Sequence, residues 1–371
     1  MACAFEVNRN LFEQALFGIQ NVAQKRTATP ILANVRIDTT ATGLRLFATD
    51  FDLGLTQELE AEVSDHGSAA LPARMLYDII KKSNADTVKL EVTDNHQATI
   101  TAGKRSRYRL VGMAPDDFPE PTVVDSDKQL TIDKDLLKLW IKKTLFAASP
   151  DETRASLSGV FIEAYESTNL RFVATDTHRL ALVEVADVVG EEIIPEEGII
   201  LPRKALLELQ RIADSDGDIV LSFDAPFVQA SWGNTIFVFR TVEGRFPTYR
   251  TVIPESTSRT AVVNRTGFIA AIDRVSLVVT DRFKCVTLKF EDGQLSVSAN
   301  NPEMGEGEEQ IDCEFDGDTL EVGFNAQYVQ DALSEITTDN IELRLIDDVS
   351  PALLYGENDE TYLNVVMPMR I

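Results

Sequence analysis

The sequence predicts an α+β fold built from three tandem copies of one module, each with two helices and an antiparallel sheet. Four markers recur in the same order three times, at intervals of about 125 residues, which is the signature of an internal repeat. Six to eight short strands per copy follow one another without a helix between each pair, which favours antiparallel pairing. We predict module boundaries at 1–125, 126–254 and 255–371.

The first marker is a short strand, a polar cap and an amphipathic helix. Val7, Ile132 and Val263 hold the same place in the three strands. Apolar residues follow at helical spacing, so one face of the helix, including Leu11 in the first copy and Leu136 in the second, is expected to be buried. The marker covers residues 5–12, 130–137 and 261–268.

The second marker is a strand of alternating apolar and polar residues that ends in a turn, as a half-buried strand does. Asp50, Asp176 and Asn301 occupy the same position in this turn. The marker covers residues 44–50, 170–176 and 295–301.

The third and fourth markers open a second helix and close each copy. A proline near the helix start is a recognised signal in two of the copies, and Pro119, Pro247 and Pro368 close the three copies. Connectors rich in proline and aspartate around 121–127 and 254–259 are the predicted linkers. The second helices open at residues 71–76, 201–206 and 323–328.

Composition excludes several classes of protein. No apolar run is long enough for a membrane span, and the N-terminus lacks the pattern of a secretory signal. The three cysteines have no C-x-x-C spacing and the three histidines do not cluster with them, so we expect free thiols in a cytoplasmic protein, no metal and no cofactor.

The net charge of −25 argues against a nucleic-acid footprint over the whole surface, but it does not exclude a local basic track. On any single helix, basic residues are usually solvated charges opposite a core face. Their recurrence on equivalent helices makes them candidates for contacts to the phosphates of a nucleic acid, which would be independent of its base sequence. These candidates are Lys25, Arg26, Arg74, Lys81, Lys82, Lys134, Lys138, Lys142, Arg203 and Lys204.

Four segments carry a resemblance to a known family. Residues 173–181 contain the pattern T-D-x-H-R-L-A, and residues 244–250, 299–303 and 365–371 add three further matches. Together they resemble the bacterial DNA polymerase III β subunit, the sliding clamp, over essentially the whole chain. The resemblance implies a non-enzymatic head-to-tail homodimer that closes into a ring, with helices inside and sheets outside. Duplex DNA would pass through the ring without sequence-specific contacts, while the ring tethers a polymerase to the DNA.

The resemblance also implies a peptide-binding pocket between the second and third modules, used by DNA polymerase, the clamp loader and repair proteins. Leu157, Leu180 and Val252 would line an apolar groove, and His178 and Arg179 would donate to peptide carbonyls. Thr177, Thr251 and Ile371 depart from residues frequent in the family. The implied pocket residues are Leu157, Thr175, Thr177, His178, Arg179, Leu180, Pro247, Val252, Phe283, Asn325, Tyr328, Val349, Pro351, Val365, Val366, Met367, Pro368, Met369, Arg370 and Ile371.

Ring closure would pair a basic edge of the first module with an acidic edge of the third, because opposite charges favour a heterologous contact. Each run alone is better explained as a solvated strand edge, and only the two runs taken as a matched pair favour an interface. The candidate interface residues are Arg105, Arg107, Tyr108, Leu277, Val278, Glu303, Glu306, Glu308 and Glu309.

Two alternatives remain. A hydrolase would use Asp176 and His178 as an orienter–base pair with Ser156 or Ser158 as nucleophile, but the sequence has no G-x-S-x-G motif. A non-catalytic monomeric scaffold of the same modules would differ from a ring in its molecular mass in solution.

Overall fold

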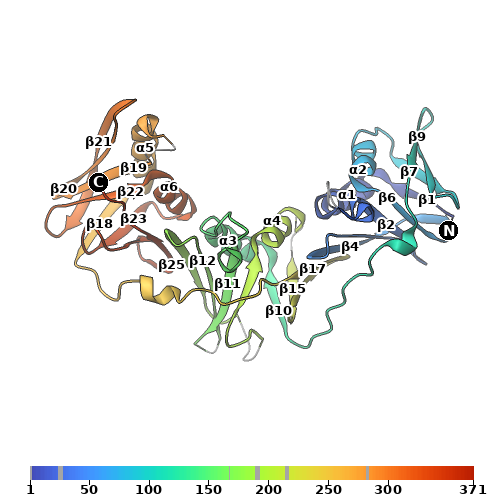
Figure 1. The fold of residues 1–371 in the computed structure, drawn as a ribbon, viewed down its shortest axis with the longest axis horizontal. Coiled ribbons are helices and arrows are strands. Elements are labelled where there is room, and N and C mark those ends of the chain that lie inside the picture. The colour runs from blue at the N-terminus through green and yellow to red at the C-terminus, as the bar shows by residue number, and fades with distance from the viewer. Residues whose placement is uncertain (1, 24–27, 167, 189–192, 214–216, 281–283) are drawn as a thin grey trace. The chain divides into compact units, whose positions relative to one another are not determined.

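The computed structural model describes residues 2–23, 28–166, 168–188, 193–213, 217–280 and 284–371. These residues form six α-helices, two in each predicted copy, and 25 strands (Figure 1). Every ladder between named strands is antiparallel, as predicted. The first copy has nine strands, more than the six to eight expected. The chain divides into two compact units, residues 1–135 with 204–241 and residues 136–203 with 242–371.

The first unit contains two sheets. A five-stranded sheet has the order β5-β1-β7-β8-β9, and an eight-stranded sheet has the order β10-β15-β16-β17-β4-β3-β2-β6. The strands are β1 (Cys3–Asn8), β2 (Asn34–Thr39), β3 (Gly43–Thr49), β4 (Leu53–Glu60), β5 (Glu62–Asp65), β6 (Ser68–Pro72), β7 (Thr87–Val92), β8 (Gln97–Ala102), β9 (Ser106–Val111), β10 (Gln129–Asp133), β15 (Asp218–Asp224), β16 (Phe227–Trp232) and β17 (Thr235–Arg240).

Three helices belong to the first unit: α1 (Arg9–Val22), α2 (Ala73–Lys81) and α4 (Arg203–Ile212), the last without Arg203. Helix α1 begins where the Asn8 side chain accepts hydrogen bonds from the amides of Asn10 and Leu11, an N-cap. Its buried face includes Phe12, which meets Phe5 edge to face at 6.2 Å between ring centroids. Helices α1 and α2 pack against each other and against the sheets.

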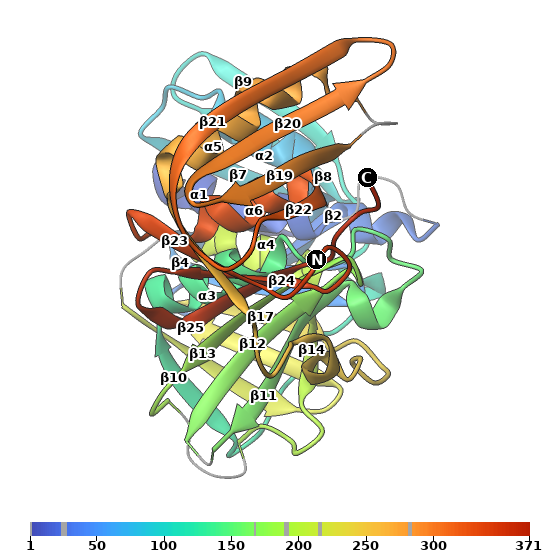
Figure 2. The same ribbon diagram turned by 90° about the vertical axis from the view of Figure 1, so that its left-hand side faces the viewer.

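The second unit contains a 12-stranded sheet with the order β14-β11-β12-β13-β25-β24-β23-β18-β21-β20-β19-β22. In Figure 2, β20 and β21 form a long hairpin beside α5. The strands are β11 (Gly159–Tyr165), β12 (Asn169–Thr175), β13 (Arg179–Val185), β14 (Ile199–Pro202), β18 (Arg259–Asn264), β19 (Cys285–Glu291), β20 (Gly293–Asn301), β21 (Gly305–Asp316), β22 (Leu320–Asn325), β23 (Asn340–Leu345), β24 (Ala352–Gly356) and β25 (Asp359–Val366).

The helices of the second unit are α3 (Lys134–Leu145), apart from its first two residues, α5 (Arg265–Val275) and α6 (Ala326–Glu335). The predicted apolar face of the first helix in each copy needs one correction. Leu11 and Leu136, which share a repeat position, are 45% and 47% exposed rather than buried. They lie at the edge of the apolar stripe, whose centre is occupied by Phe12 and Leu137.

Two ladders join one copy to the next. Strand β17 of the second copy pairs with β4 of the first, with Thr235 opposite Gln57. Strand β25 of the third copy pairs with β13 of the second, with Tyr362 opposite Val183. Each large sheet therefore continues across a boundary between copies.

The described residues contain no helix that is both long and apolar enough to cross a membrane. In the same part of the chain, no three His, Cys, Asp or Glu side chains gather into a group that could hold a metal ion.

Candidate functional site

A tight turn between β12 and β13 forms one wall of the candidate site. The Thr175 hydroxyl donates to the carbonyl of Arg179 at 2.6 Å and accepts the amide of Thr177 at 3.0 Å. Asp176 Oδ1 accepts the amides of His178 and Arg179, at 2.9 and 3.1 Å. Thr177 sits in the left-handed region, with φ of 80°, where a β-branched residue is strained.

The last strand of the third copy forms the neighbouring wall. Val365 lies opposite Leu180 in the β13–β25 ladder, and the Met367 amide donates to the His178 carbonyl at 2.9 Å. Two residues on, the Met369 amide donates to the Gly323 carbonyl at 2.8 Å. The first bond holds the chain after β25 against the second copy, and the second bond holds it against β22 of the third copy.

Between these walls lies a groove of about 240 Å³. Leu180, Val252, Val365 and Met367 supply apolar surface, and the threonines supply hydroxyls at its rim. A small apolar groove with a few polar groups suits a short peptide or a small molecule. The lining residues are Thr175, Thr177, Arg179, Leu180, Pro247, Thr248, Tyr249, Thr251, Val252, Val365 and Met367.

Tyr249 anchors the segment that closes the groove on its third side. Its side chain is buried and its hydroxyl donates to the Glu163 carboxylate, which also accepts Arg250 Nη2 at 2.7 Å. Burial, followed by the bond to Glu163, raises the pKa of Tyr249. The phenol therefore stays neutral and keeps this segment in place at neutral pH.

Arg179 joins three parts of the second unit. Its Nε donates to Asp176 Oδ2 at 3.1 Å, its Nη2 donates to the Phe146 carbonyl at 2.6 Å, and its Nη1 pairs with Asp331 on α6. The guanidinium also lies 4.5 Å from the ring centroid of Tyr328. Each nitrogen already has an acceptor within the chain, so Arg179 lines the groove chiefly as a brace rather than as the free donor expected from the sequence.

The same contacts bear on the hydrolase alternative. Both oxygens of Asp176 are held by backbone amides and by Arg179. An orienting carboxylate must instead accept a hydrogen bond from an N–H of the histidine ring. The His178 ring lies 6.4 Å from the Tyr328 ring, centroid to centroid, with planes 21° apart. Asp176 thus builds a turn and does not orient His178.

A second cavity of about 500 Å³ lies beside the first turn of α6. Two predicted pocket residues, Asn325 and Tyr328, line this cavity and not the groove. The Asn325 side chain caps α6 by accepting the amide of Gln327 at 3.0 Å. The cavity is lined by Ser276, Val279, Thr280, Lys284, Asn325, Ala326, Gln327, Tyr328 and Gln330.

The remaining predicted pocket residues are dispersed. Leu157 and Val366 are buried, whereas Val349 and Ile371 are 71% and 73% exposed. Phe283 lies outside the described residues. Pro351 and Pro368 are partly exposed, and Met369 and Arg370 are exposed.

Sequence reasoning missed three residues of the site, and it named a fourth, Thr251, only as a departure from the family. Thr248, Tyr249 and Thr251 line the groove, and Arg154 donates to the Thr177 hydroxyl at 3.2 Å. The first three follow the predicted closing motif Phe246–Pro247, so proximity to that motif was a usable signal. Arg154 lies in an irregular loop and carried none.

The predicted basic residues divide by exposure. Arg74, Lys81, Lys82, Lys142 and Lys204 are exposed, whereas Lys138 and Arg203 are partly exposed. Several form ion pairs: Arg74 with Asp78 at 3.3 Å, Lys142 with Glu335 at 3.0 Å, and Lys204 with Asp50. Lys25 and Arg26 lie outside the described residues.

Lys134 is wrong as a DNA-facing residue, because it is only 3% exposed. It holds the repeat position of Arg9 and Arg265. Arg9 donates to carbonyls at the end of α2, Ile80 at 3.2 Å and Lys81 at 2.8 Å, and Arg265 donates to the Thr338 carbonyl, just after α6, at 3.0 Å. Arg9 and Arg265 thus bind backbone carbonyls at or just after the end of the second helix of their copy.

The two predicted interface edges lie in different units. Strand β9, which contains Arg107 and Tyr108, pairs with β8 on one side, and its side chains are mostly exposed. In β21, residues 305–312 pair with β20, whereas β18 pairs only with residues 313–316. Arg105, Leu277, Glu303, Glu306 and Glu308 are exposed, Val278 is partly exposed, and Glu309 pairs with Arg274.

Family models match nearly the whole chain in three consecutive parts. They are described as the N-terminal, central and C-terminal domains of the DNA polymerase III beta subunit, and they match residues 3–123, 131–248 and 250–370. The beta sliding clamp of Caulobacter vibrioides is 32% identical over 98% of this chain and 99% of its own length. That of Pseudomonas putida is 32% identical over 99% of this chain and all of its own.

Solved structures give the same result. The sliding clamp of Bartonella birtlesii, bound to griselimycin, has a TM-score of 0.95 and 34% identity over the full length of both chains. The Caulobacter crescentus clamp has a TM-score of 0.93 and 32% identity over 100% of this chain and 99% of its own. That clamp holds polyethylene glycol in a region proposed to tether a β-motif.

Proposed function

Because this chain belongs to the DNA polymerase III β subunit family, which its three domain matches show, we infer that it acts as a DNA sliding clamp. The family is a non-catalytic processivity factor, so the chain is not an enzyme. The clamp encircles duplex DNA and tethers the replicative polymerase and other partners. We place it in the cytoplasm, and we assign its three modules to residues 1–125, 126–254 and 255–371.

The groove between the turn at Thr175–Arg179 and Met367 is the observation that carries the partner-binding part of the proposal. Its apolar lining suits two or three apolar side chains of a short linear peptide, and the backbone around Thr177 and Met367 fixes its shape. Its small size favours weak, exchangeable binding, which a tether shared by several partners requires.

Ring closure in this proposal uses the two open strand edges. Strand β9 offers Arg105, Arg107 and Tyr108, and the first half of β21 offers Glu306 and Glu308. An unpaired edge is a template for pairing with another chain, and an edge of one sign that meets an edge of the other in a second copy gives a head-to-tail contact. Leu277, which is 79% exposed, adds apolar surface to the third-copy side.

Duplex DNA is contacted in this proposal by the exposed cations on the helices. Arg74, Lys81, Lys82, Lys142 and Lys204 are exposed there, and the ion pair of Arg74 with Asp78, between two solvent-exposed side chains, is weak. A phosphate exchanges with such a carboxylate at little cost, so the contacts are salt-dependent and blind to sequence. Such contacts permit sliding.

Topology provides the test. The protein is loaded onto nicked circular DNA by its clamp loader, and the circle is then cut once by a restriction enzyme. We expect the protein to stay on the circle through gel filtration and to leave after linearisation. Equal retention on both forms would refute encirclement.

A variant with Arg105→Glu and Arg107→Glu serves as the control. It should remain folded, since both side chains are exposed, yet lose retention on the circle. A stable single-chain mass for the unaltered protein at micromolar concentration would support the monomeric scaffold instead.

A further inference from the structure

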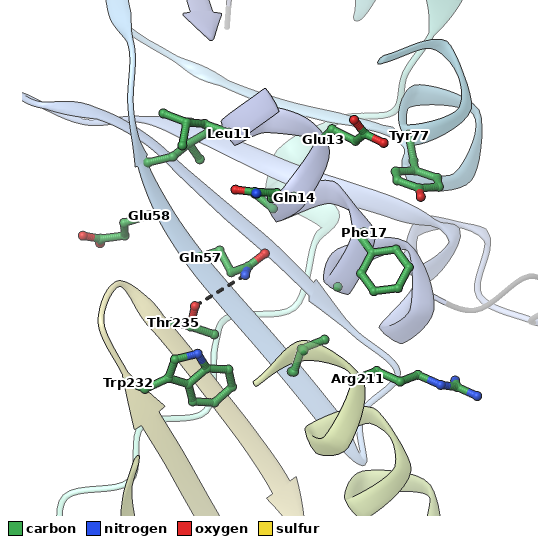
Figure 3. Close-up of a pocket in the computed structure, with 14 residues that line it drawn as sticks. Leu11, Glu13, Gln14, Phe17, Gln57, Glu58, Tyr77, Arg211, Trp232 and Thr235 are labelled. Atoms are coloured by element: carbon green, nitrogen blue, oxygen red, sulfur yellow. Dashed lines mark hydrogen bonds between the residues drawn. The ribbon is translucent and has the colours of Figure 1, made fainter. Parts of the chain in front are cut away.

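The first unit holds a cavity of about 560 Å³ between the first and second copies, distinct from the groove (Figure 3). It lies between α1, β4 and the tip of the β16–β17 hairpin, with the end of α4 on a further side. Its volume is in the range of sites for drug-sized ligands. Its main features are Phe17, Gln57, Tyr77, Ile212, Trp232 and Thr235.

The repeat explains why this space is open. In the β13–β25 ladder, Tyr362 stands opposite Val183, and in the equivalent β4–β17 ladder Thr235 stands opposite Gln57. Tyr362 is only 1% exposed, and its hydroxyl donates to the Lys143 carbonyl at 2.8 Å. In the first unit the corresponding strand position carries only a threonine. The space that a phenol fills in the second unit is therefore not filled by the chain in the first.

A polar atom without a partner points to a hydrogen-bond donor as the missing group. Gln57 Oε1 is buried and has no hydrogen-bond partner. Its amide is held only by a long bond, 3.4 Å, from Nε2 to the Thr235 hydroxyl, drawn in Figure 3. Rotation about the terminal amide torsion, which is soft, would turn Oε1 into the cavity. A buried acceptor without a donor is destabilising, and a ligand hydroxyl that donates to it would remove that cost.

The charged groups of the lining are already paired. Glu13 pairs with Arg9 at 2.7 Å, Glu58 with Arg45 at 2.8 Å, and Arg211 with Glu208 at 2.7 Å. The cavity thus has little net charge to offer a ligand. Aromatic walls remain: Phe17 and Tyr77 lie 6.1 Å apart, and Trp232 borders the other side.

We propose that this cavity is a second ligand site, which takes a neutral phenolic ring and binds its hydroxyl through Gln57 Oε1. The ring takes the place that Tyr362 fills in the other unit. The cavity is larger than one phenol, so it also accommodates groups beside the ring, as a tyrosine side chain in a peptide would carry.

Intrinsic fluorescence gives a direct test, because the chain has two tryptophans and Trp232 lines the cavity. In a Trp140→Phe background, N-acetyltyrosinamide and p-cresol should each change Trp232 emission to saturation. N-acetylphenylalaninamide, which lacks the hydroxyl, should bind roughly fivefold more weakly. Tighter binding of N-acetyltyrosinamide than of p-cresol would indicate a peptide ligand, and equal binding a free phenol.

Three variants make the test decisive. Thr235→Tyr should fill the cavity and abolish the response. Gln57→Val, which copies Val183, should remove the preference for tyrosine over phenylalanine without removing binding. Met367→Arg, which blocks the groove, should leave the Trp232 response as it was. No saturable response, a response that survives Thr235→Tyr, or one lost in Met367→Arg would each overturn the proposal.

Discussion

The junction between the first two copies and the junction between the last two share a backbone and differ in side chains. In the first, Thr49 and Asp50 form the turn before β4, and in the second Thr175 and Asp176 form the same turn before β13. The Arg240 amide donates to the Asp52 carbonyl at 2.9 Å, and in the same way the Met367 amide donates to the His178 carbonyl at 2.9 Å. Both turns place the next residue at positive φ, 77° at Phe51 and 80° at Thr177.

The side chains then diverge. Asp50 takes one cation, Lys204, which is half exposed, whereas Asp176 shares the nearly buried Arg179 with Asp331. At the first junction, Arg240 occupies the repeat position of Met367, which lines the groove at the second junction. Thr235 likewise occupies the repeat position of Tyr362, which is buried at the second junction. The repeated backbone therefore gives both junctions an equivalent place for a ligand. A few side chains then determine which part of each junction is left open to that ligand. Each experiment below changes one of these differences.

The largest effect is expected from Arg179→Ala. It leaves the carboxylates of Asp176 and Asp331 facing each other in a partly buried place, which costs about 3–5 kcal/mol of unfolding free energy. Lys204→Ala should cost only about 1 kcal/mol, because the Lys204 side chain is half exposed and its loss leaves one carboxylate rather than two without a cation. Denaturant unfolding measures both, with Trp140 reporting on the second unit and Trp232 on the first. Equal losses of unfolding free energy in the two variants would show that Arg179 and Lys204 stabilise their junctions to the same extent.

Met367→Arg makes the second junction resemble the first at the groove. A charge in place of an apolar wall should weaken binding of a polymerase-derived peptide by about 2 kcal/mol, roughly 30-fold in Kd. Deletion of residues 367–371 should do at least as much. Fluorescence anisotropy with a labelled peptide measures the change, and the matched Arg240→Met variant should bind as the unaltered protein does. Unchanged affinity in Met367→Arg would remove the groove from partner binding.

The two positive-φ residues differ in a smaller way. Thr177→Gly should raise stability by about 1 kcal/mol, because a β-branched residue in the left-handed region is strained. Phe51→Gly should raise it by about half as much, because Phe is not β-branched. Thermal unfolding compares the two. A loss of stability in Thr177→Gly would mean that the bond from Arg154 outweighs the strain.

The smallest effect is a pH dependence of the second junction. Burial and Glu163 raise the pKa of Tyr249, so the folded state holds this proton more tightly than the unfolded state. Its contribution to stability is complete below the ordinary tyrosine pKa of about 10 and is lost as pH rises through the folded-state value. Denaturant midpoints measured with Trp140 should fall above that pH, and the Tyr249→Phe variant should flatten the fall. An unchanged slope would assign the loss to other groups.

Much of the fold could be predicted because its signals are local. Apolar spacing identified both helices of each copy, and alternation identified the antiparallel strands. The pairing of β17 with β4 could not be predicted, because the local sequence of a strand does not indicate which distant strand it pairs with. The buried Lys134 was mistaken for a surface cation for a related reason: helical spacing gives the face of a residue but not what packs on it.

The candidate site was predictable in part. Six motif residues do come together in one groove, whereas His178 is not part of its lining: Thr175, Thr177, Arg179, Leu180, Val365 and Met367. Asn325 and Tyr328 line a second cavity instead, beside the first turn of α6. The role of Arg179 as a brace depended on Asp331, which lies far along the chain and carries no motif.

The pairing of β25 with β13 has a consequence for biosynthesis. Residues 359–366 emerge from the ribosome after every other strand of the second unit, yet they form a wall of the groove beside residues made much earlier. A nascent chain halted before β25 would lack that wall and could not hold a partner there. The groove is therefore one of the last features of the second unit that the growing chain can complete.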